Sequence, residues 1–184
     1  MLARDDAYKL LTSKLKRENM VKHCLAVEAI MREFASRFNG DRELWGLTGL
    51  LHDIDFDETF NDPKRHGVLA AEYLKGLLPE EALRAIISHN FENTGVKPES
   101  VMEKALIVAD ALSGLIVACA LVMPHKKLSE VKVETIEKKF KAKDFARGVS
   151  RERISLCKEI GLSEREAFEI GLQAMLRIAD KLGL

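Results

Sequence analysis

The chain has 184 residues, of which 47% are hydrophobic and 32% are charged, a balance typical of folded globular proteins rather than disordered ones. Its 29 Lys and Arg residues equal its 29 Asp and Glu residues, so the formal net charge is zero. This balance gives no general electrostatic reason to bind nucleic acid or an anionic membrane, and we expect neither as a partner. A local group of side chains can still hold a small phosphate-containing ligand.

Helical periodicity runs through most of the chain, and no stretch alternates between apolar and polar residues as a half-buried strand would. Helix starts are expected near residue 4, at the cap Asn19, at Asp41, at Asp62-Pro63, at Pro79, at the cap Ser100 and at the capping box Ser163–Glu166. Helix ends are expected near residue 16, at Asn39-Gly40, at His52-Asp53 and at Gly161. The sequence therefore predicts an all-α protein with at least seven helices, in a single domain of residues 1–184.

The most apolar stretch, residues 105–123, is long enough to cross a bilayer, but it contains Asp110. A carboxylate at the centre of a span costs about 3 kcal/mol, so we expect a buried core helix instead. Cys24, Cys119 and Cys157 form no CxxC pair and have apolar neighbours, which indicates reduced core residues. The first residues lack the basic and apolar regions of a signal peptide, so we expect a cytoplasmic protein.

Six potential metal ligands occur in a fixed order between residues 23 and 110. They are His23, the adjacent pair His52-Asp53, His66, His89 and Asp110. At least three of them lie in apolar helical runs, where a charged or imidazole group that is buried alone costs several kcal/mol. A divalent metal is the simplest partner that imidazoles and carboxylates can share, so we expect these six residues to form a metal site.

Individual members of this set also have other interpretations. Asp110 has no Lys or Arg three or four residues away, and it can instead cap a neighbouring helix or pair with a distant arginine. A histidine like His23, taken alone, is more often a hydrogen-bonded core residue than a ligand, and only its combination with His52, Asp53 and Asp110 favours a ligand. Neighbouring residues on a helix diverge by about 100°, so His52 and Asp53 can face one point only at a helix end. We expect them there, although Asp53 can also be solvated.

Three further residues near this set have weaker signals. Asp55 and Asp57 follow the pair closely and can accept hydrogen bonds from imidazole N–H groups, or they can be ordinary loop residues. His125 follows Pro124 among lysines, and we expect it on the surface.

In this ordered set the sequence resembles the HD-domain superfamily of metal-dependent phosphohydrolases. The family pattern is a His, an adjacent His-Asp pair and a distal Asp, matched here by His23, His52-Asp53 and Asp110. The further histidines His66 and His89 resemble the subset with two metals. In size and ligand order the chain looks like the bacterial branch that cleaves dinucleoside polyphosphates.

Two departures from the family pattern limit what the resemblance implies. Asp55 occupies a position where many members have Gly. No Gly-Tyr-Pro follows His89, so the chain is unlike the phosphodiesterases that act on cyclic di-GMP.

The resemblance implies an HD-domain-like helical bundle with its metal-binding core at about residues 20–123 and a C-terminal helical extension at about 124–184. It implies one metal held by His23, His52, Asp53 and Asp110, with Asp53 bridging to a second metal held by His66 and His89. His52 and Asp53 would form the catalytic centre. One or two divalent transition metal ions are expected, chosen among Fe, Mn, Co, Ni and Zn.

The expected function is hydrolysis of a phosphoester or phosphoanhydride bond, in a nucleotide, by a metal-activated water. A non-catalytic nucleotide-binding module that signals and a di-iron oxygenase are the alternatives. Lys64 and Arg65, next to His66, are candidates for binding substrate phosphate. The lysine-rich segment 126–143, with Arg147 and Arg151, is either a solvated helix face or a rim that attracts phosphate. The sequence leaves the oligomeric state open.

Overall fold

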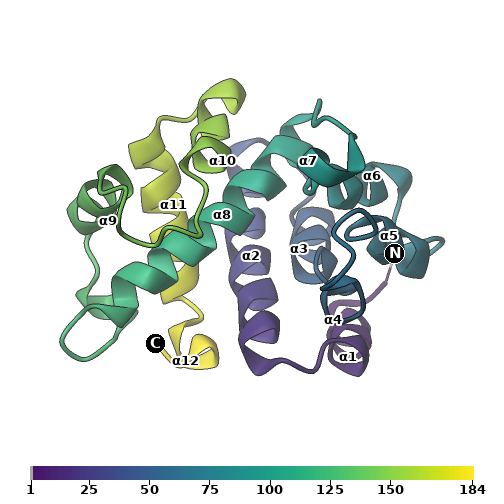
Figure 1. The fold of residues 1–184 in the computed structure, drawn as a ribbon, viewed down its shortest axis with the longest axis horizontal. Helices are drawn as coiled ribbons and strands as arrows, with labels where there is room; N and C mark the ends of the chain where they lie inside the picture. The colour runs from purple at the N-terminus through teal and green to yellow at the C-terminus, as the bar shows by residue number, and fades with distance from the viewer. Residues whose placement is uncertain (1) are drawn as a thin grey trace.

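The computed structural model describes residues 2–184, and within that range the chain consists of helices and turns (Figure 1). An isolated bridge between Lys75 and Leu78 is the one β-type contact in these residues, so the predicted all-α class is confirmed. The helices in chain order are α1 (Arg4–Lys14), α2 (Glu18–Arg37), α3 (Arg42–Leu51), α4 (Phe56–Thr59), α5 (Val68–Leu74), α6 (Glu80–Ser88), α7 (Phe91–Thr94), α8 (Val101–Leu121), α9 (Val133–Lys141), α10 (Arg151–Ser155), α11 (Glu164–Leu176) and α12 (Ala179–Leu182), with 3-10 helices η1 (Leu128–Glu130) and η2 (Leu156–Ile160).

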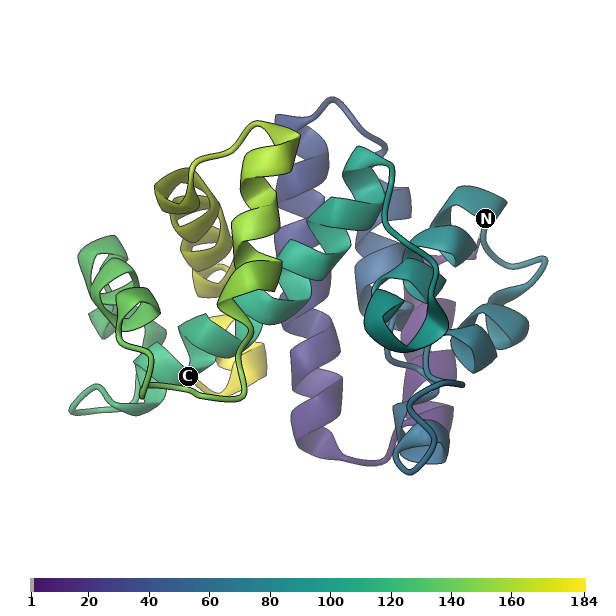
Figure 2. The same cartoon turned by 45° about the horizontal axis from the view of Figure 1, so that its top comes forward.

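The long apolar helix α8 lies at the centre of the molecule. It begins at Ser100, whose hydroxyl accepts a hydrogen bond from the Glu103 backbone N–H at 3.2 Å. α8 crosses α2, with α1 and α3–α7 on one side of this pair and α9–α11 on the other (Figure 1, Figure 2). By length and composition α8 could cross a membrane, with a mean hydropathy of 2.0, but 61% of its most apolar window is buried inside the fold. Its apolar surface is therefore used in the core.

α2 and α3 form a helical hairpin. Asp41 starts α3, because its carboxylate accepts hydrogen bonds from the backbone N–H groups of Glu43 and Leu44 at 2.9 and 3.0 Å. The two helices approach closely at Gly49, where an added Cβ would lie 2.9 Å from the Val27 carbonyl oxygen. Since the connection between the helices is short, the end of α3 returns beside the first half of α2, the part that carries His23.

Several helix boundaries differ from the sequence expectation. α1 ends at Lys14, and α2 begins at Glu18, so Asn19 lies inside α2 instead of capping it. The helix expected at Pro63 begins only at Val68, because Gly67 has a φ of +83° that no regular helix allows. His66 therefore lies in the turn before α5 and not in a first helical turn. The short helices α4 and α7 were not expected, since four residues are too few to show a helical period.

Buried apolar side chains form one continuous core that includes residues from Ala7 in α1 to Leu182 in α12. The extension expected from residue 124 begins just after α8 ends. Within it, the Arg151 guanidinium donates hydrogen bonds to the backbone carbonyls of Lys139, Phe140, Ala142, Phe145, Ala146 and Val149. Gly161, with a φ of +81°, ends η2, and the predicted capping box Ser163–Glu166 starts α11.

Candidate metal centre

The end of α3 carries His52 and Asp53 into the interior. His52 directly follows the last residue of α3 and is fully buried, and its Nδ1 donates a hydrogen bond to the Gly49 carbonyl at 2.8 Å. Asp53 lies in the following turn, with Oδ1 3.3 Å from His52 Nε2. Both side chains face one point because the helix has ended and no longer separates them by about 100°.

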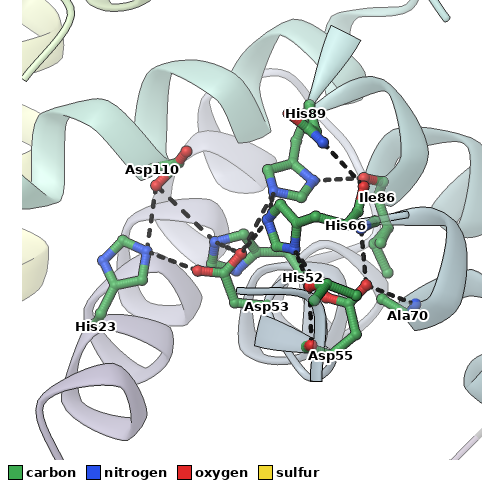
Figure 3. Close-up of polar contacts among 12 residues, drawn as sticks. His23, His52, Asp53, Asp55, His66, Ala70, Ile86, His89 and Asp110 are labelled. Carbon is green, nitrogen blue, oxygen red and sulfur yellow. Dashed lines mark hydrogen bonds and ion pairs between the residues drawn. The ribbon is translucent and has the colours of Figure 1, made fainter. Parts of the chain in front are cut away.

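His23 of α2 and Asp110 of α8 lie on one side of Asp53 (Figure 3). His23 Nε2 is 3.2 Å from Asp110 Oδ1 and 3.5 Å from Asp53 Oδ2. Ser113, one turn after Asp110, donates its hydroxyl proton to the Asp110 carbonyl at 2.8 Å, so it accepts from His23 Nδ1 at 3.2 Å. α8 thus supplies one potential ligand directly and orients a second one through Ser113.

His66 and His89 lie on the opposite side of Asp53 (Figure 3). Their Nε2 atoms are 3.2 and 3.4 Å from Asp53 Oδ1 and 3.1 Å from each other. His89 directly follows α6, as expected from the sequence, and its Nδ1 donates to the Ile86 carbonyl. The six predicted residues are therefore brought together, and we call them the His/Asp cluster.

Asp55 supports the turn that carries His66. It is fully buried, and its Oδ1 accepts a hydrogen bond from His66 Nδ1 at 2.9 Å. Its Oδ2 accepts from the backbone N–H groups of Gly67 and Ala70 at 2.8 and 3.0 Å. One carboxylate thus orients the imidazole and satisfies the free N–H groups at the start of α5, as expected of a residue behind a metal ligand.

Each of the four imidazoles has its Nδ1 engaged and its Nε2 turned toward the middle of the cluster. Protonated at Nδ1, a neutral imidazole keeps the Nε2 lone pair free to bind a cation. The buried His52 Nε2 has no hydrogen-bond partner among the described residues, which a cation would supply. The Nε2 atoms of His66 and His89 would repel each other without a proton or a cation between them.

The donors form two groups that share one carboxylate. The first group is His23, His52 and Asp53, and the second is Asp53, His66 and His89. Asp110 adjoins the first group, with its Oδ1 3.9 Å from His52 Nε2. Imidazole nitrogens with carboxylate oxygens are donors suited to divalent transition metals, so the residues present fit such ions.

The electrostatics of the His/Asp cluster suit a cation. Burial lowers the pKa of His52 to about 4. Burial would raise the pKa of Asp53 and of Asp110, but neighbouring imidazoles outweigh it and lower both. Burial also opposes protonation of His66, yet its hydrogen bonds to Asp53 and Asp55 raise its pKa to about 10. Asp53 and Asp110 therefore stay ionised, and a cation would replace the proton that His66 carries.

A cleft of about 300 Å³ opens over the His/Asp cluster, and we call it the metal cleft. Arg153 of α10 is the one Lys or Arg among its lining residues. Its guanidinium donates to Asp110 Oδ2 at 2.9 Å, to the Glu92 carboxylate at 2.9 and 3.1 Å, and to the His89 carbonyl. Asp110 therefore has the distant arginine partner that the sequence allowed as an alternative, and it also lies within 3.2 Å of His23 in the His/Asp cluster.

Comparison with known proteins now identifies the family. Residues 20–115 of the 184 match the family model of the HD domain. The chain belongs to the HD-domain family. A segment of 100 residues is 38% identical to the uncharacterized protein MJ0778 of Methanocaldococcus jannaschii, and it covers 52% of this chain and 57% of that protein. No solved structure matches the chain.

HD domains bind divalent metals and are typically metal-dependent hydrolases. The family match contains all six members of the His/Asp cluster, from His23 to Asp110. Family membership and donor geometry therefore agree on a centre for divalent metal.

Arg153 lies outside the matched HD-domain segment, and the sequence pointed to Arg147 and Arg151 instead. Residues two apart on a helix differ by about 200°, so Arg151 and Arg153 leave α10 in nearly opposite directions. Arg151 binds backbone carbonyls of residues 139–149, and exposed Arg147 pairs with Asp144 at 3.1 Å. The alternation Arg151-Glu152-Arg153 indicates that two arginines face opposite ways, but it does not say which one faces the HD-domain core.

The other basic candidates lie away from the metal cleft. Lys64 and Arg65 are exposed on the turn before His66 and do not line the cleft. The lysines of segment 126–143 lie on α9 and the turns beside it, and none of them lines the cleft. His125 is exposed, as expected, and its Nδ1 lies 2.8 Å from Glu130.

Asp57 does not take the place beside an imidazole that the sequence allowed for it. Its carboxylate accepts from the Lys16 backbone N–H at 2.7 Å and pairs with Arg17 at 3.1 Å. Asp57 lies in α4, and its side chain reaches the link between α1 and α2. Arg17 at the end of this link is extended and precedes Glu18, the first residue of α2, so Asn19 lies inside the helix.

Proposed function

We propose that this HD domain is a metal-dependent phosphohydrolase that cleaves a phosphoester or phosphoanhydride bond in a small molecule, with a nucleotide as the first candidate. The position of Asp53 carries the proposal. Its Oδ1 faces His66 and His89 at 3.2 and 3.4 Å, and its Oδ2 faces His23 at 3.5 Å. A carboxylate shared by two donor groups suits two adjacent cations. These donors accept Fe, Mn, Co, Ni or Zn.

Divalent cations bound at these donors supply the activation of a water nucleophile and neutralise charge on phosphoryl oxygens. The protein's own part is to hold the donors in place through the fixed Nδ1 contacts. His52 and Asp53 are central, because Asp53 belongs to both donor groups and His52 is the fully buried imidazole of the first group. Arg153 adds a positive charge to the wall of the metal cleft, where a guanidinium N–H can donate to a phosphate oxygen.

Water is the nucleophile that the composition of the metal cleft favours. Its lining residues include no Ser, Thr or Cys. Cys24, near Asp53, is buried, and burial raises the pKa of its thiol well above the usual range, which disfavours the thiolate. In the hydrolysis a water oxygen bonds to phosphorus, and the bond from phosphorus to the leaving oxygen breaks. The leaving oxygen keeps the electron pair and takes up a proton.

Metal analysis and a substrate panel test the proposal together. The purified protein should carry divalent metal and release product from nucleotides or other phosphoesters. Asp53→Asn should lower turnover by several orders of magnitude, because both donor groups lose their shared charge. His125→Ala, which removes an exposed imidazole, is the matched control and should retain metal and turnover.

Other results of the same experiment would reject the proposal. Metal-free protein that takes up no metal on titration would remove its basis. Oxygen consumption by the iron-loaded protein without phosphate release would favour the di-iron oxygenase. Tight nucleotide binding without turnover would favour a signalling module.

We also propose a cytoplasmic location and no nucleic-acid partner. All three cysteines are buried and unpaired, which suits a reducing compartment. The formal charge of zero provides no surface excess of cations for a polyanion.

A further inference from the structure

The metal cleft continues into two further cavities along α8. A middle cavity of about 390 Å³ shares His23, Asp110 and Arg153 with the metal cleft. A far cavity of about 400 Å³ shares His23 and Gly114 with the middle cavity. The three cavities therefore adjoin one another in a row that starts at the His/Asp cluster. We call this row the path, and its middle and far cavities the α8 groove.

One face of α8 forms the floor of this path. Asp110, Gly114, Val117 and Leu121 follow one another at steps of four, three and four residues, so they lie on one stripe of the helix. With a rise of 1.5 Å per residue, this stripe is about 16 Å long. It begins at a charged member of the His/Asp cluster and ends at Leu121, which is 50% exposed. An apolar ligand that lay along this stripe would cover Leu121 and remove its apolar surface from water.

The walls of the α8 groove come from α2 and from the C-terminal part of the chain. The segment that joins α9 to α10 runs along α8 before the chain enters α10 (Figure 2). At Gly148 in this segment an added Cβ would meet no atom within 4 Å, so the middle cavity is open there. Leu182 and Leu184 line the far cavity together with Val117 and Leu121. These C-terminal walls lie outside residues 20–115 and belong to this chain's own extension, whereas Lys22, His23 and Ala26 of the far cavity belong to the HD domain.

The path is strongly polar at one end and more apolar at the other. The metal cleft holds two carboxylates, three imidazoles and Arg153, whereas the far cavity combines the polar residues Asn19, Lys22, His23 and Ser113 with the apolar residues Ala26, Val117, Leu121, Leu182 and Leu184. An inorganic phosphate or a simple sugar phosphate would leave the apolar end in contact with water. A phosphate head joined to an apolar organic group matches both ends.

We propose that the substrate is a phosphate ester or anhydride with an extended apolar organic group, which lies in the α8 groove while the phosphate lies at the His/Asp cluster. This assignment rests on the proposed phosphohydrolase function and narrows its substrate. It places phosphates with an apolar tail ahead of the unmodified nucleotides named first under the proposed function, because Val117, Leu121, Leu182 and Leu184 give an apolar tail a surface that nucleotide hydroxyl groups would not use.

Non-hydrolysable alkylphosphonates test the assignment by binding alone. Calorimetry on the metal-loaded protein compares methyl-, pentyl- and decylphosphonate, which share one head group and differ only in the chain that would enter the α8 groove. Affinity should rise about fourfold for each methylene group that is fully buried. Equal affinity for the three compounds would overturn the groove assignment, as would tighter binding of a nucleoside phosphonate than of decylphosphonate.

A matched pair of variants at the end of α8 locates the apolar chain. Leu121→Glu changes a groove residue, and Val122→Glu makes the same change at the next residue, which is 53% exposed and does not line the groove. Leu121→Glu should weaken decylphosphonate binding about five- to tenfold and affect methylphosphonate much less. Val122→Glu should leave the dependence on chain length intact. Equal losses in both variants would show non-specific adsorption and overturn the assignment.

Gly114→Val provides a second, independent block where the middle and far cavities meet. A Cβ at Gly114 would lie 3.4 Å from Val149 Cγ2, which is an ordinary contact, so the larger side chain should narrow the groove without breaking the helix. Pentyl- and decylphosphonate should then bind with similar affinity. If no phosphonate binds to wild-type protein that carries metal, the phosphohydrolase proposal itself fails and the groove assignment fails with it. Binding of methylphosphonate alone separates the two failures.

Discussion

The substitution Asp55→Asn changes one atom behind His66 and should remove one metal from the centre. Asp55 Oδ2 accepts from two backbone N–H groups, at Gly67 and Ala70, so the amide oxygen of Asn must take that place. The amide NH₂ then faces His66 Nδ1, which in wild type donates to Asp55 Oδ1 at 2.9 Å. Nδ1 must now accept, and the imidazole proton moves to Nε2. A protonated Nε2 cannot bind a metal.

The size of the effect follows from the contacts that change. Residues behind metal ligands typically contribute 10- to 100-fold to metal affinity. The metal affinity of the donor group Asp53, His66 and His89 should therefore fall by about that factor. The group of His23, His52 and Asp53 makes no contact with Asp55 and should keep its metal. In metal-free protein, hydrogen bonds to a charged acceptor become neutral ones, which should lower the free energy of unfolding by about 1–3 kcal/mol.

Metal titration with elemental analysis, together with urea unfolding of the metal-free protein, measures both effects. At a free metal concentration that saturates both sites of wild type but lies below the weakened dissociation constant, the number bound per chain should fall from about two to about one. Asp57→Asn is the matched control, since it makes the same change two residues later in a partly exposed ion pair with Arg17. It should lower the free energy of unfolding by less than about 1 kcal/mol and leave metal binding unchanged. Full binding of two metals by Asp55→Asn would contradict the tautomer assigned to His66.

Three further results are expected. The double variant of His66→Ala and His89→Ala should bind about one metal per chain and hydrolyse substrate several orders of magnitude more slowly, measured by elemental analysis and product release; parent-rate turnover would assign both histidines to the substrate instead. Hydrogen bonds to aspartates raise the pKa of His66 to about 10 against the effect of burial, so His66 is protonated at pH 7 before metal binds. Metal uptake at pH 7 should therefore release about one proton from His66, and metal affinity should fall as pH falls. Calorimetry in two buffers measures the proton release, and uptake without it would contradict the protonated state of His66. Ser163→Ala should lower the free energy of unfolding by about 1 kcal/mol in urea titration, since α11 loses its cap, and an unchanged midpoint would show that the cap is not needed.

Part of the site was predictable, because residue type and helix boundaries can be recognised from a few neighbouring residues. Asp110 stands out in an apolar helix with no neighbouring cation, and His52-Asp53 could share a site only if a helix ended there, as α3 does. Asp57 and His66 show the limit of such signals. Proline at residue 63 is a valid local start for a helix, but the turn that carries His66 is held by Asp55 from another part of the chain.

By itself, the sequence determined the helical class, the main helix starts and the ordered set of metal-binding side chains, because periodicity, caps and residue type act over a few neighbouring residues. Tertiary structure alone decided which oxygen of Asp53 faces which imidazole and that Arg153, not Arg151, reaches the metal cleft. It also decided that this cleft continues along α8 between walls from the end of the chain. These features depend on how α2, α8 and α10 pack against one another. Residues that come together only through this packing are far apart in the sequence, so their neighbours in the sequence do not indicate the contact.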